Sequence, residues 1–507
     1  MATPAENLAK SLEALKKLQS QSEGIAIRSR DLSRTDRERL TDNGFLKEAM
    51  KGWYYPTSPN ERLGESTAWY AAFWPFCAAY LEERFGADWS LSPEQSLLLH
   101  AGNLTVPPQL LVRAKKAGKK IIQLPHKTSL LDVAAALPPE GHADTLEGLR
   151  VFSLEAALIF CSPGFFAQHA IDAKAVLGKI QDSSALLAML LEEGRSRIAG
   201  RLVGALRHIG RERIADDMLK TMESVGYTVN VSNPFEDEQT ILSRTVSEPA
   251  HVTRLRIMWD SMRDPVIANF PEAPGLPQDV QSYLESVNEI YANDAYNSLS
   301  IEGYRVTPDL IERVKSGRWN PDQDRSDFEQ RDALAARGYW QAFQGVKKSV
   351  EAILKGGLAG EVVDQDHGDW YRELFAPSVT AGIIRPSDLA GYRSNPVYIR
   401  QSMHVPMNFS AVRDAMPVFF ELLSKEENAA VRVVLGHFVF VYIHPYPDGN
   451  GRIGRFLMNT MLASGGYDWL VVPLEQRERY MRSLETASVQ QNIVPFTQLL
   501  AELLDMQ

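Results

Sequence analysis

His444-Pro-Tyr-Pro-Asp-Gly-Asn-Gly-Arg-Ile-Gly-Arg455 is the stretch of this 507-residue chain that decides its fold. The apolar run 429–443 before it is typical of a buried helix and ends in a histidine. The two prolines of the stretch end that helix and force a turn, and its glycines let the backbone bend tightly. A second helix is predicted from about Arg452, so the stretch joins two helices through a narrow turn.

The residues of this turn suit chemistry on a phosphate. A glycine-rich turn leading into a helix presents unpaired N–H groups and a partial positive charge to an anion. Arg452 and Arg455 lie three residues apart, hence on one helix face, and each guanidinium can hold phosphate oxygens. Asp448 would repel a polyphosphate unless a cation lay between them, which predicts Mg²⁺ there. His444 is the only group of the turn able to take a proton near neutral pH.

Together these residues predict phosphoryl or nucleotidyl transfer from a Mg²⁺–nucleotide, with His444 activating the acceptor. A Walker A loop is excluded because the chain has no GxxxxGK[ST] sequence. The alternative is a simple tight loop between two helices. One histidine, one aspartate, one asparagine and two arginines within the stretch argue against that alternative.

At these residues the chain resembles the Fic family, whose motif HxFx[D/E]GNGRxxR is matched with Tyr446 in place of the usual Phe. The resemblance covers roughly residues 280–505 and implies a protein adenylyltransferase, which moves AMP from ATP to a Ser, Thr or Tyr hydroxyl of a target protein. It implies that His444 deprotonates the hydroxyl and that Asp448 holds Mg²⁺. It also implies a set of phosphate-binding residues: Gly449, Asn450, Gly451, Arg452 and, for the γ-phosphate, Arg455.

A second segment, Ser298-Leu-Ser-Ile-Glu302-Gly303, resembles the inhibitory pattern [S/T]xxxE[G/N] of the same family. On a helix near 290–303, Ser298 and Glu302 share one face, and Gly303 ends the helix. The resemblance implies that Glu302 forms a salt bridge with Arg455 and blocks the triphosphate. The alternative is a solvated glutamate at a helix end.

Two further segments carry looser resemblances. Residues 391–406 resemble a β-hairpin flap that pairs with the target's backbone, with a plain surface hairpin as the alternative. The predicted target-binding residues of this flap are Val397, Tyr398, Ile399, Arg400 and His404. Tyr480, on a predicted helix, resembles a residue that lines the adenine pocket, although a tyrosine at helical spacing is often part of the core.

The periodicity of apolar residues predicts a predominantly α chain with its main boundary near residue 250, where the composition turns polar and Pro-rich. We expect a helical Fic core with a short β-hairpin flap, preceded by a winged-helix-like domain and a helical middle region. The expected domains are residues 251–507, 1–130 and 131–250, respectively. Short β-like pieces are expected at 52–56, 120–124 and 397–405.

The N-terminal segment 5–130 also resembles a winged-helix antitoxin domain of the AbiEi type, as found in toxin–antitoxin pairs, with Gly52-Trp-Tyr-Tyr-Pro56 as its wing. The run Arg113–Lys127 holds six Lys or Arg and no acid. DNA is therefore one predicted partner of this region. The alternative is a solvated basic face on a module that binds protein.

The composition excludes several other classes. A net charge of −10 gives no general attraction to nucleic acid or anionic lipid. The chain offers no apolar run long enough to cross a bilayer, and its N-terminus is predicted as an amphipathic helix instead of a signal peptide. Cys77 and Cys161 lie in apolar surroundings and are predicted as buried free thiols. We therefore expect a cytoplasmic protein without a membrane partner; the alternative is an effector exported by a route that the sequence does not show.

Three hypotheses follow from the sequence. The first is a protein adenylyltransferase that uses ATP and Mg²⁺ and is autoinhibited by Glu302. The second is a DNA-binding regulator whose Fic domain senses nucleotide. The third is an enzyme of the same fold that removes AMP or uses another nucleotide. The target protein stays open, as does assembly into a homo-oligomer.

Overall fold

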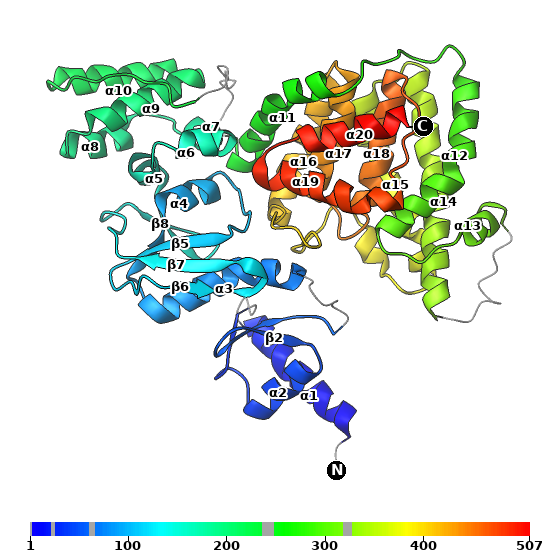
Figure 1. Cartoon of the computed structure of the whole chain (residues 1–507), viewed down its shortest axis with the longest axis horizontal. Coiled ribbons are helices and arrows are strands. Elements are labelled where there is room, and N and C mark those ends of the chain that lie inside the picture. Colours follow the sequence, from blue (N-terminus) through cyan, green and yellow to red (C-terminus); the bar gives the residue numbers. More distant parts are fainter. Residues whose placement is uncertain (1–2, 22–25, 60–65, 236–247, 318–326, 507) are drawn as a thin grey trace. The chain divides into compact units, whose positions relative to one another are not determined.

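The computed structural model describes residues 3–21, 26–59, 66–235, 248–317 and 327–506 (Figure 1). The chain forms two compact units: unit 1 comprises residues 1–254 with 398–405, and unit 2 comprises 255–397 with 406–507. Helices dominate the described part of both units, so the predominantly α prediction is confirmed.

Unit 1 opens with two helices and a small antiparallel sheet. The helices are α1 (Pro4–Gln21) and α2 (Arg34–Asp42). The strands, in sheet order, are β1 (Ile27–Arg28), β3 (Trp53–Pro56) and β2 (Leu46–Met50). Ser33 caps α2 by accepting a hydrogen bond from the Asp36 N–H. The strand expected at 52–56 is present as β3, while the AbiEi resemblance stays a prediction.

A mixed sheet forms the centre of unit 1, in the order β4 (Trp89–Leu91), β5 (Gln109–Ala114), β7 (Ser129–Val133) and β6 (Ile121–Gln123). The central strands β5 and β7 are parallel, and β6 corresponds to the strand expected at 120–124. The domain boundary expected at residue 130 falls inside β7, which pairs with a strand on each side. The sheet holds both sides of that boundary together, so the chain is not divided there.

The remaining elements of unit 1 are two helices beside this sheet, a hairpin and a series of helices. They are α3 (Thr67–Phe85), α4 (Pro93–His100), β8 (Ala143–Leu146), β9 (Leu149–Phe152), α5 (Leu154–Phe160), α6 (Phe165–Gln168), α7 (Ala170–Gly178), α8 (Ser184–Glu192), α9 (Ser196–His208) and α10 (Glu212–Ser224). Cys77 and Cys161 are buried free thiols, as predicted. Burial raises the pKa of Cys161 to about 12, which keeps it protonated and unreactive.

Unit 2 is a helical bundle around a central antiparallel pair. That pair is α17 (Ala429–Ile443) and α18 (Asn450–Gly465), and nearly every side chain of α17 is buried because its sequence is apolar on all faces. The surrounding helices are α12 (Val280–Ile301), α13 (Pro308–Lys315), α14 (Asp327–Leu354), α15 (Ala359–Thr380), α16 (Phe409–Lys425), α19 (Arg477–Gln490) and α20 (Val494–Asp505), and α11 (Ala250–Asn269) leads into the bundle (Figure 1).

The expected β-hairpin at 397–405 is wrong. All of residues 391–406 are described, and they form turns and irregular backbone. Residues 398–405 belong to unit 1, where the Val106 N–H donates to the Met403 carbonyl over 2.9 Å and Met403 packs on the core. Met403 thus uses its carbonyl and its side chain in contacts within unit 1.

Within the described ranges, none of the helices combines the length and apolar character that crossing a bilayer requires.

Candidate active site

The predicted catalytic stretch is the turn between α17 and α18. His444 follows the last residue of α17 with a left-handed backbone, at φ 55° and ψ 59°. Gly449, also left-handed at φ 80°, precedes α18 and lies so close to the ring of Phe375 that a side chain there would collide with it. Helix α18 begins at Asn450, two residues before the expected start, so the first N–H groups of α18 belong to the turn itself.

His444 is held in one tautomer. Its Nδ1 lies 3.1 Å from the Val441 carbonyl oxygen, which can only accept, so Nδ1 carries the hydrogen. The lone pair of Nε2 is then available to accept a proton. Burial lowers the pKa of His444 to about 4, against the carbonyl contact and with help from the charge of Arg393. The imidazole is therefore neutral at pH 7, the state that a general base needs.

Hydrogen bonds and ring stacking within unit 2 hold the backbone of this turn. Asn450 is buried, and its side-chain oxygen accepts from the Tyr446 N–H over 2.9 Å while its NH₂ donates to the Tyr446 carbonyl over 2.8 Å. The Tyr446 ring stacks on Tyr371 with the centroids 3.9 Å apart. The structure thus gives Asn450 a role in shaping the turn, and its predicted contact with phosphate stays a prediction.

Two buried arginines, Arg452 and Arg455, lie near the start of α18. The guanidinium of Arg452 lies 5.1 Å from the Tyr304 ring centroid and 4.9 Å from that of Phe375. Nε of Arg452 and Nη1 of Arg455 are buried without a hydrogen-bond partner among the described residues. Buried donors of this kind are costly when unpaired, and an anion satisfies them. The site therefore fits a phosphate group.

Asp448 is the acid of this turn, and its side chain is 68% exposed. One carboxylate oxygen accepts from the Gly449 N–H over 2.6 Å, and the other lies 3.5 Å from Nη2 of Arg452. Within the described ranges, no group of three or more His, Cys, Asp or Glu residues could hold a metal ion. Asp448 alone still fits Mg²⁺, because this ion is commonly bound by one or two carboxylates, water and the substrate's phosphates.

Glu302 reaches this site from α12. The helix ends at Ile301, and Gly303 follows Glu302 with φ 91°, so the chain turns away immediately after the glutamate. Nη2 of Arg455 lies 2.7 Å from Oε1 of Glu302. The same guanidinium donates from Nε to the Ser298 hydroxyl over 2.9 Å and from Nη2 to the Ser298 carbonyl over 3.0 Å.

The Glu302 carboxylate lies where an anion would meet α18. A Cβ atom on Gly451, in the first turn of the helix, would collide with Oε1 of Glu302. Burial disfavours the charge of Arg455, but the nearby Glu302 carboxylate outweighs it and raises the pKa of Arg455. The carboxylate and the guanidinium therefore hold each other in the position that the resemblance assigns to a triphosphate.

One buried acid near this ion pair was not predicted from the sequence. Asp294, two turns before Glu302 on the same face of α12, accepts a 2.7 Å hydrogen bond from the Tyr339 hydroxyl. Burial raises the pKa of Asp294 to about 6, while the Tyr339 hydrogen bond and the charge of Arg455 lower it. The four-residue spacing of Asp294, Ser298 and Glu302 is the signal that could have identified it.

Comparison with known proteins matches residues 366–462 to the sequence model of the Fic/DOC family. This segment is therefore similar to the Fic domains of that family. A protein adenylyltransferase Fic of Drosophila virilis is 29% identical over 218 residues, which are 42% of this chain and 41% of that protein. A protein adenylyltransferase Fic of Drosophila ananassae is 34% identical over 125 residues, 24% of each chain. The chain thus spans about two fifths or less of these relatives.

The chain was also compared with solved structures. Fic-1 (residues 134–508) of C. elegans is 19% identical, with a TM-score of 0.36, and the match covers 67% of this chain and 96% of that one. A Fic-domain signalling protein of Bacteroides thetaiotaomicron is 17% identical, with a TM-score of 0.35, over 50% of this chain and 93% of that one.

Two further sets of predicted residues lie outside the Fic turn, which is the turn 444–455 between α17 and α18. Tyr480 is 1% exposed on α19, and its hydroxyl lies 2.6 Å from Nε2 of the buried His437. Tyr480 also interacts with Arg455, and its predicted contact with adenine stays a prediction. The predicted flap residues Tyr398–Arg400 and the buried His404 belong to unit 1, whereas Val397 lines a pocket of unit 2 beside Asp448. Their contact with a target stays a prediction.

A pocket of about 490 Å³ opens beside the Fic turn, within unit 2. Aromatic side chains from α15 form one wall, and residues 390–397 form another. Its lining includes Tyr371, Phe375, Tyr392, Arg393, Arg413, Pro447 and Asp448. Since Asp448 lines the pocket, an acceptor side chain placed there would lie next to the phosphate-binding turn.

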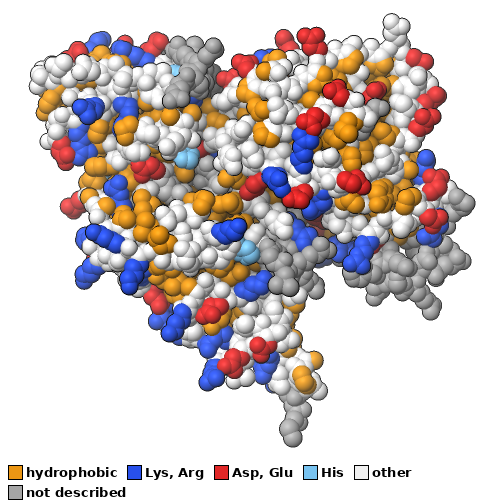
Figure 2. All heavy atoms as spheres, viewed as in Figure 1, with side chains coloured by type: hydrophobic (Ala, Val, Ile, Leu, Met, Phe, Trp, Pro, Cys, Tyr) orange, Lys and Arg blue, Asp and Glu red, His pale blue; other side chains and the backbone are white. Residues whose placement is uncertain are grey.

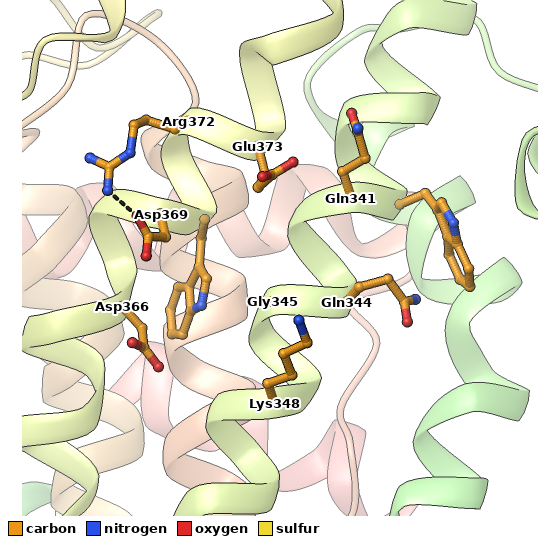
Figure 3. A pocket seen from close by; sticks show the side chains of 10 residues that line it. Gln341, Gln344, Gly345, Lys348, Asp366, Asp369, Arg372 and Glu373 are labelled. Carbon is orange, nitrogen blue, oxygen red and sulfur yellow. Dashed lines mark hydrogen bonds and ion pairs between the residues drawn. The ribbon is translucent and has the colours of Figure 1, made fainter.

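A second pocket of unit 2, about 620 Å³, lies away from this turn between α14 and α15 (Figure 3). Gln344 and Lys348 of α14 lie across it from Asp366 and Asp369 of α15, and Arg372 forms an ion pair with Asp369 at its edge. None of the predicted site residues lines this pocket.

Proposed function

We propose that this protein is an autoinhibited protein adenylyltransferase, which transfers AMP from ATP to a hydroxyl group of a target protein. The observation that carries the proposal is the Arg455–Glu302 ion pair, at 2.7 Å, lying against the first turn of α18. A carboxylate held at a helix N-terminus marks an anion-binding site. The Drosophila relatives named as protein adenylyltransferases support this choice of reaction.

His444 is the general base of the proposed reaction. Nε2, whose lone pair is free because Nδ1 donates to Val441, takes the proton of the acceptor hydroxyl. The hydroxyl oxygen forms a bond to the α-phosphorus, the bond to the β-phosphate bridging oxygen breaks, and pyrophosphate leaves. The N–H groups of Asn450 and Gly451 and the unpaired donors of Arg452 and Arg455 stabilise the phosphate charge.

Asp448 holds Mg²⁺ in this proposal, because its carboxylate is exposed at the same turn. The ion, when bound, neutralises phosphate charge during transfer.

Glu302 makes the resting state inactive. Productive binding of the triphosphate requires Arg455 to exchange the Glu302 carboxylate for phosphate oxygens. The Arg455 side chain is 3% exposed, so separating this pair without a replacement is costly, on the order of 3–5 kcal/mol. Any event that moves the end of α12 therefore activates the enzyme.

The test uses the Glu302→Gly variant and ATP labelled on either the α- or the γ-phosphate. AMP transfer places only the α-label on protein, and intact mass shows an added adenylyl group. A γ-label on protein contradicts AMP transfer. Unlabelled protein with either nucleotide, in the presence of a lysate that supplies targets, contradicts transferase activity altogether. Loss of AMP from previously modified protein supports the reverse reaction instead.

A second candidate function, nucleic-acid binding by unit 1, is favoured by its basic surface (Figure 2). Lys116, Lys119 and Lys120 are exposed within the run 113–127. By contrast, four arginines of the segment 28–39 form ion pairs with acids, namely Arg28, Arg30, Arg34 and Arg39. The triple change of these lysines to glutamate abolishes any shift of duplex DNA at moderate salt, whereas an unchanged shift excludes this surface.

We further propose a cytoplasmic location. Size-exclusion chromatography tests for a homo-oligomer. Mass spectrometry of labelled lysate identifies the protein target.

A further inference from the structure

Arg393 joins three backbone segments beneath the Fic turn. It follows the 3-10 turn Pro386–Leu389, and its side chain is 2% exposed. Its Nε donates to the His444 carbonyl over 2.8 Å, and its backbone N–H donates to the Pro445 carbonyl over 2.9 Å. The acceptors of its two Nη groups are the carbonyls of Asn395, at 3.3 Å, and Met407.

These bonds bear directly on the catalytic histidine. A left-handed backbone is unfavourable for a residue with a side chain, so the conformation of His444 must be held by its surroundings. The carbonyl of His444 lies past the end of α17, where helix hydrogen bonding has stopped. A charged donor fixes that carbonyl more strongly than a neutral one would.

We propose that Arg393 is the positioning residue of the general base: it locks the backbone of His444 and so fixes the direction of its imidazole. This inference rests on the proposed transferase function. Arg393 acts through His444 and takes no proton itself. The planar fork of a guanidinium can reach several carbonyls at once, which a lysine ammonium at the end of a flexible chain cannot reproduce.

The same contacts connect His444 to the pocket of about 490 Å³ that Asp448 lines. Asn395 and Met407 flank the segment 396–406, and Arg393 holds both of their carbonyls. Tyr392, Arg393 and Asn395 all line the pocket beside Asp448. One side chain thus sets the distance between the histidine and the place where the hydroxyl must lie. Misplacement of reacting groups by about 1 Å can cost about 100-fold in rate.

Arg393 also influences the proton affinity of His444. The groups that act on this imidazole are the Val441 carbonyl, Glu302 and Asp448, which favour its charged form, and Arg393, which opposes it. Removal of the Arg393 charge therefore raises the pKa of His444. A purely structural role, in which Arg393 merely fills space, does not move this pKa through charge.

The experiment compares Arg393→Gln, Arg393→Lys and Arg393→Ala in the Glu302→Gly background, with Arg385→Gln as the matched control. Arg385 directly precedes the 3-10 turn Pro386–Leu389, and it is exposed and paired with Asp388. We expect Arg393→Gln to lower kcat by about 10- to 100-fold with the Kd for ATP changed less than threefold. Arg393→Lys recovers activity only in part, guanidinium ion rescues Arg393→Ala, and Arg385→Gln retains parental activity.

NMR supplies a readout independent of turnover. The ring resonance of His444, assigned with His444→Ala, should titrate at higher pH in Arg393→Gln than in the parent, and Arg393→Lys should keep the lower pKa. Unchanged kcat and an unchanged His444 titration in folded Arg393→Gln overturn the inference. If Arg393→Gln does not fold, Arg393→Lys with full parental kcat overturns it. A Glu302→Gly parent without AMP transfer instead contradicts the proposed function, and the NMR titration still tests Arg393.

Discussion

The Fic turn 444–455 and the neighbouring segment 391–406 differ in what holds their backbones. The turn is fixed by its own residues: prolines end α17, Gly449 takes a left-handed conformation, and Asn450 bonds back to Tyr446. The segment is fixed by distant residues, among them Val106 of unit 1. A motif with local restraints can be interpreted from its letters, whereas a segment with remote partners cannot.

The largest expected effect lies in the turn. His444→Ala, made in the Glu302→Gly background, should lower AMP transfer by about 10²- to 10⁴-fold because it removes the proton acceptor. The phosphate-binding groups remain, so calorimetry should show an ATP affinity close to that of the parent. Transfer within about threefold of the parent would remove His444 from the mechanism.

A substitution of Asn450 distinguishes its two possible roles, which are shaping the turn and binding phosphate. Asn450→Ala leaves the Tyr446 N–H and carbonyl buried and unpaired, which should lower the free energy of unfolding by about 1–3 kcal/mol. Urea denaturation measures this change. Full stability with a loss of ATP affinity would show that the amide contacts phosphate, as the family resemblance implies.

The pH dependence tests the environment of the base. Because the pKa of His444 is lowered to about 4, its neutral form persists as the pH falls, and transfer should stay near maximal down to about pH 5. At pH 5.5, a histidine with the usual pKa of about 6.5 would retain only about a tenth of its neutral form. Activity halved near pH 6.5 in a protein still folded there would contradict this assignment.

The same shift makes a signed contribution to stability. The unfolded chain binds a proton at His444 as the pH falls below about 6.5, whereas the folded chain resists it down to about pH 4. Stability from this group is therefore present above pH 6.5 and is lost between the two values. His444→Ala should flatten the acid side of the unfolding curve.

The smallest effect concerns the segment 391–406. Met403→Ala removes a partly buried side chain from the core of unit 1 and should lower its stability by about 1 kcal/mol, without altering the ATP affinity of unit 2. Differential scanning calorimetry measures the first change and titration calorimetry the second. A normal unfolding transition combined with lost target modification would instead favour the flap interpretation.

The sequence predicted what local chemistry specifies. The helix 429–443, the turn after it, the Ser298–Glu302 face and the strands near 52–56 and 120–124 depend on prolines, glycines, apolar runs or short spacings, and the structure contains them. Strands β5 and β7 were missed because Gln109–Ala114 and Ser129–Val133 are short leucine-rich runs, which fit a helix as well as a strand.

The rest of the site depends on contacts that the sequence does not display. Arg393 binds backbone carbonyls, and every residue has a carbonyl, so no partner residue marks its role. Tyr480 was assigned to adenine by resemblance, and its spacing on a helix did not show that its hydroxyl lies 2.6 Å from Nε2 of His437. The ion pairs of Arg28 and Arg30 with Glu83 likewise depend on which acids the fold brings close.

The central claim, that Glu302 inhibits by holding Arg455, is tested most directly by auto-modification with α-labelled ATP in three proteins. Glu302→Gly should exceed wild type by at least about tenfold, the factor that corresponds to 1.4 kcal/mol of relieved inhibition. The double variant Glu302→Gly, Arg455→Ala should lose that gain, because the arginine is the group released. A folded Glu302→Gly protein no more active than wild type would contradict the account.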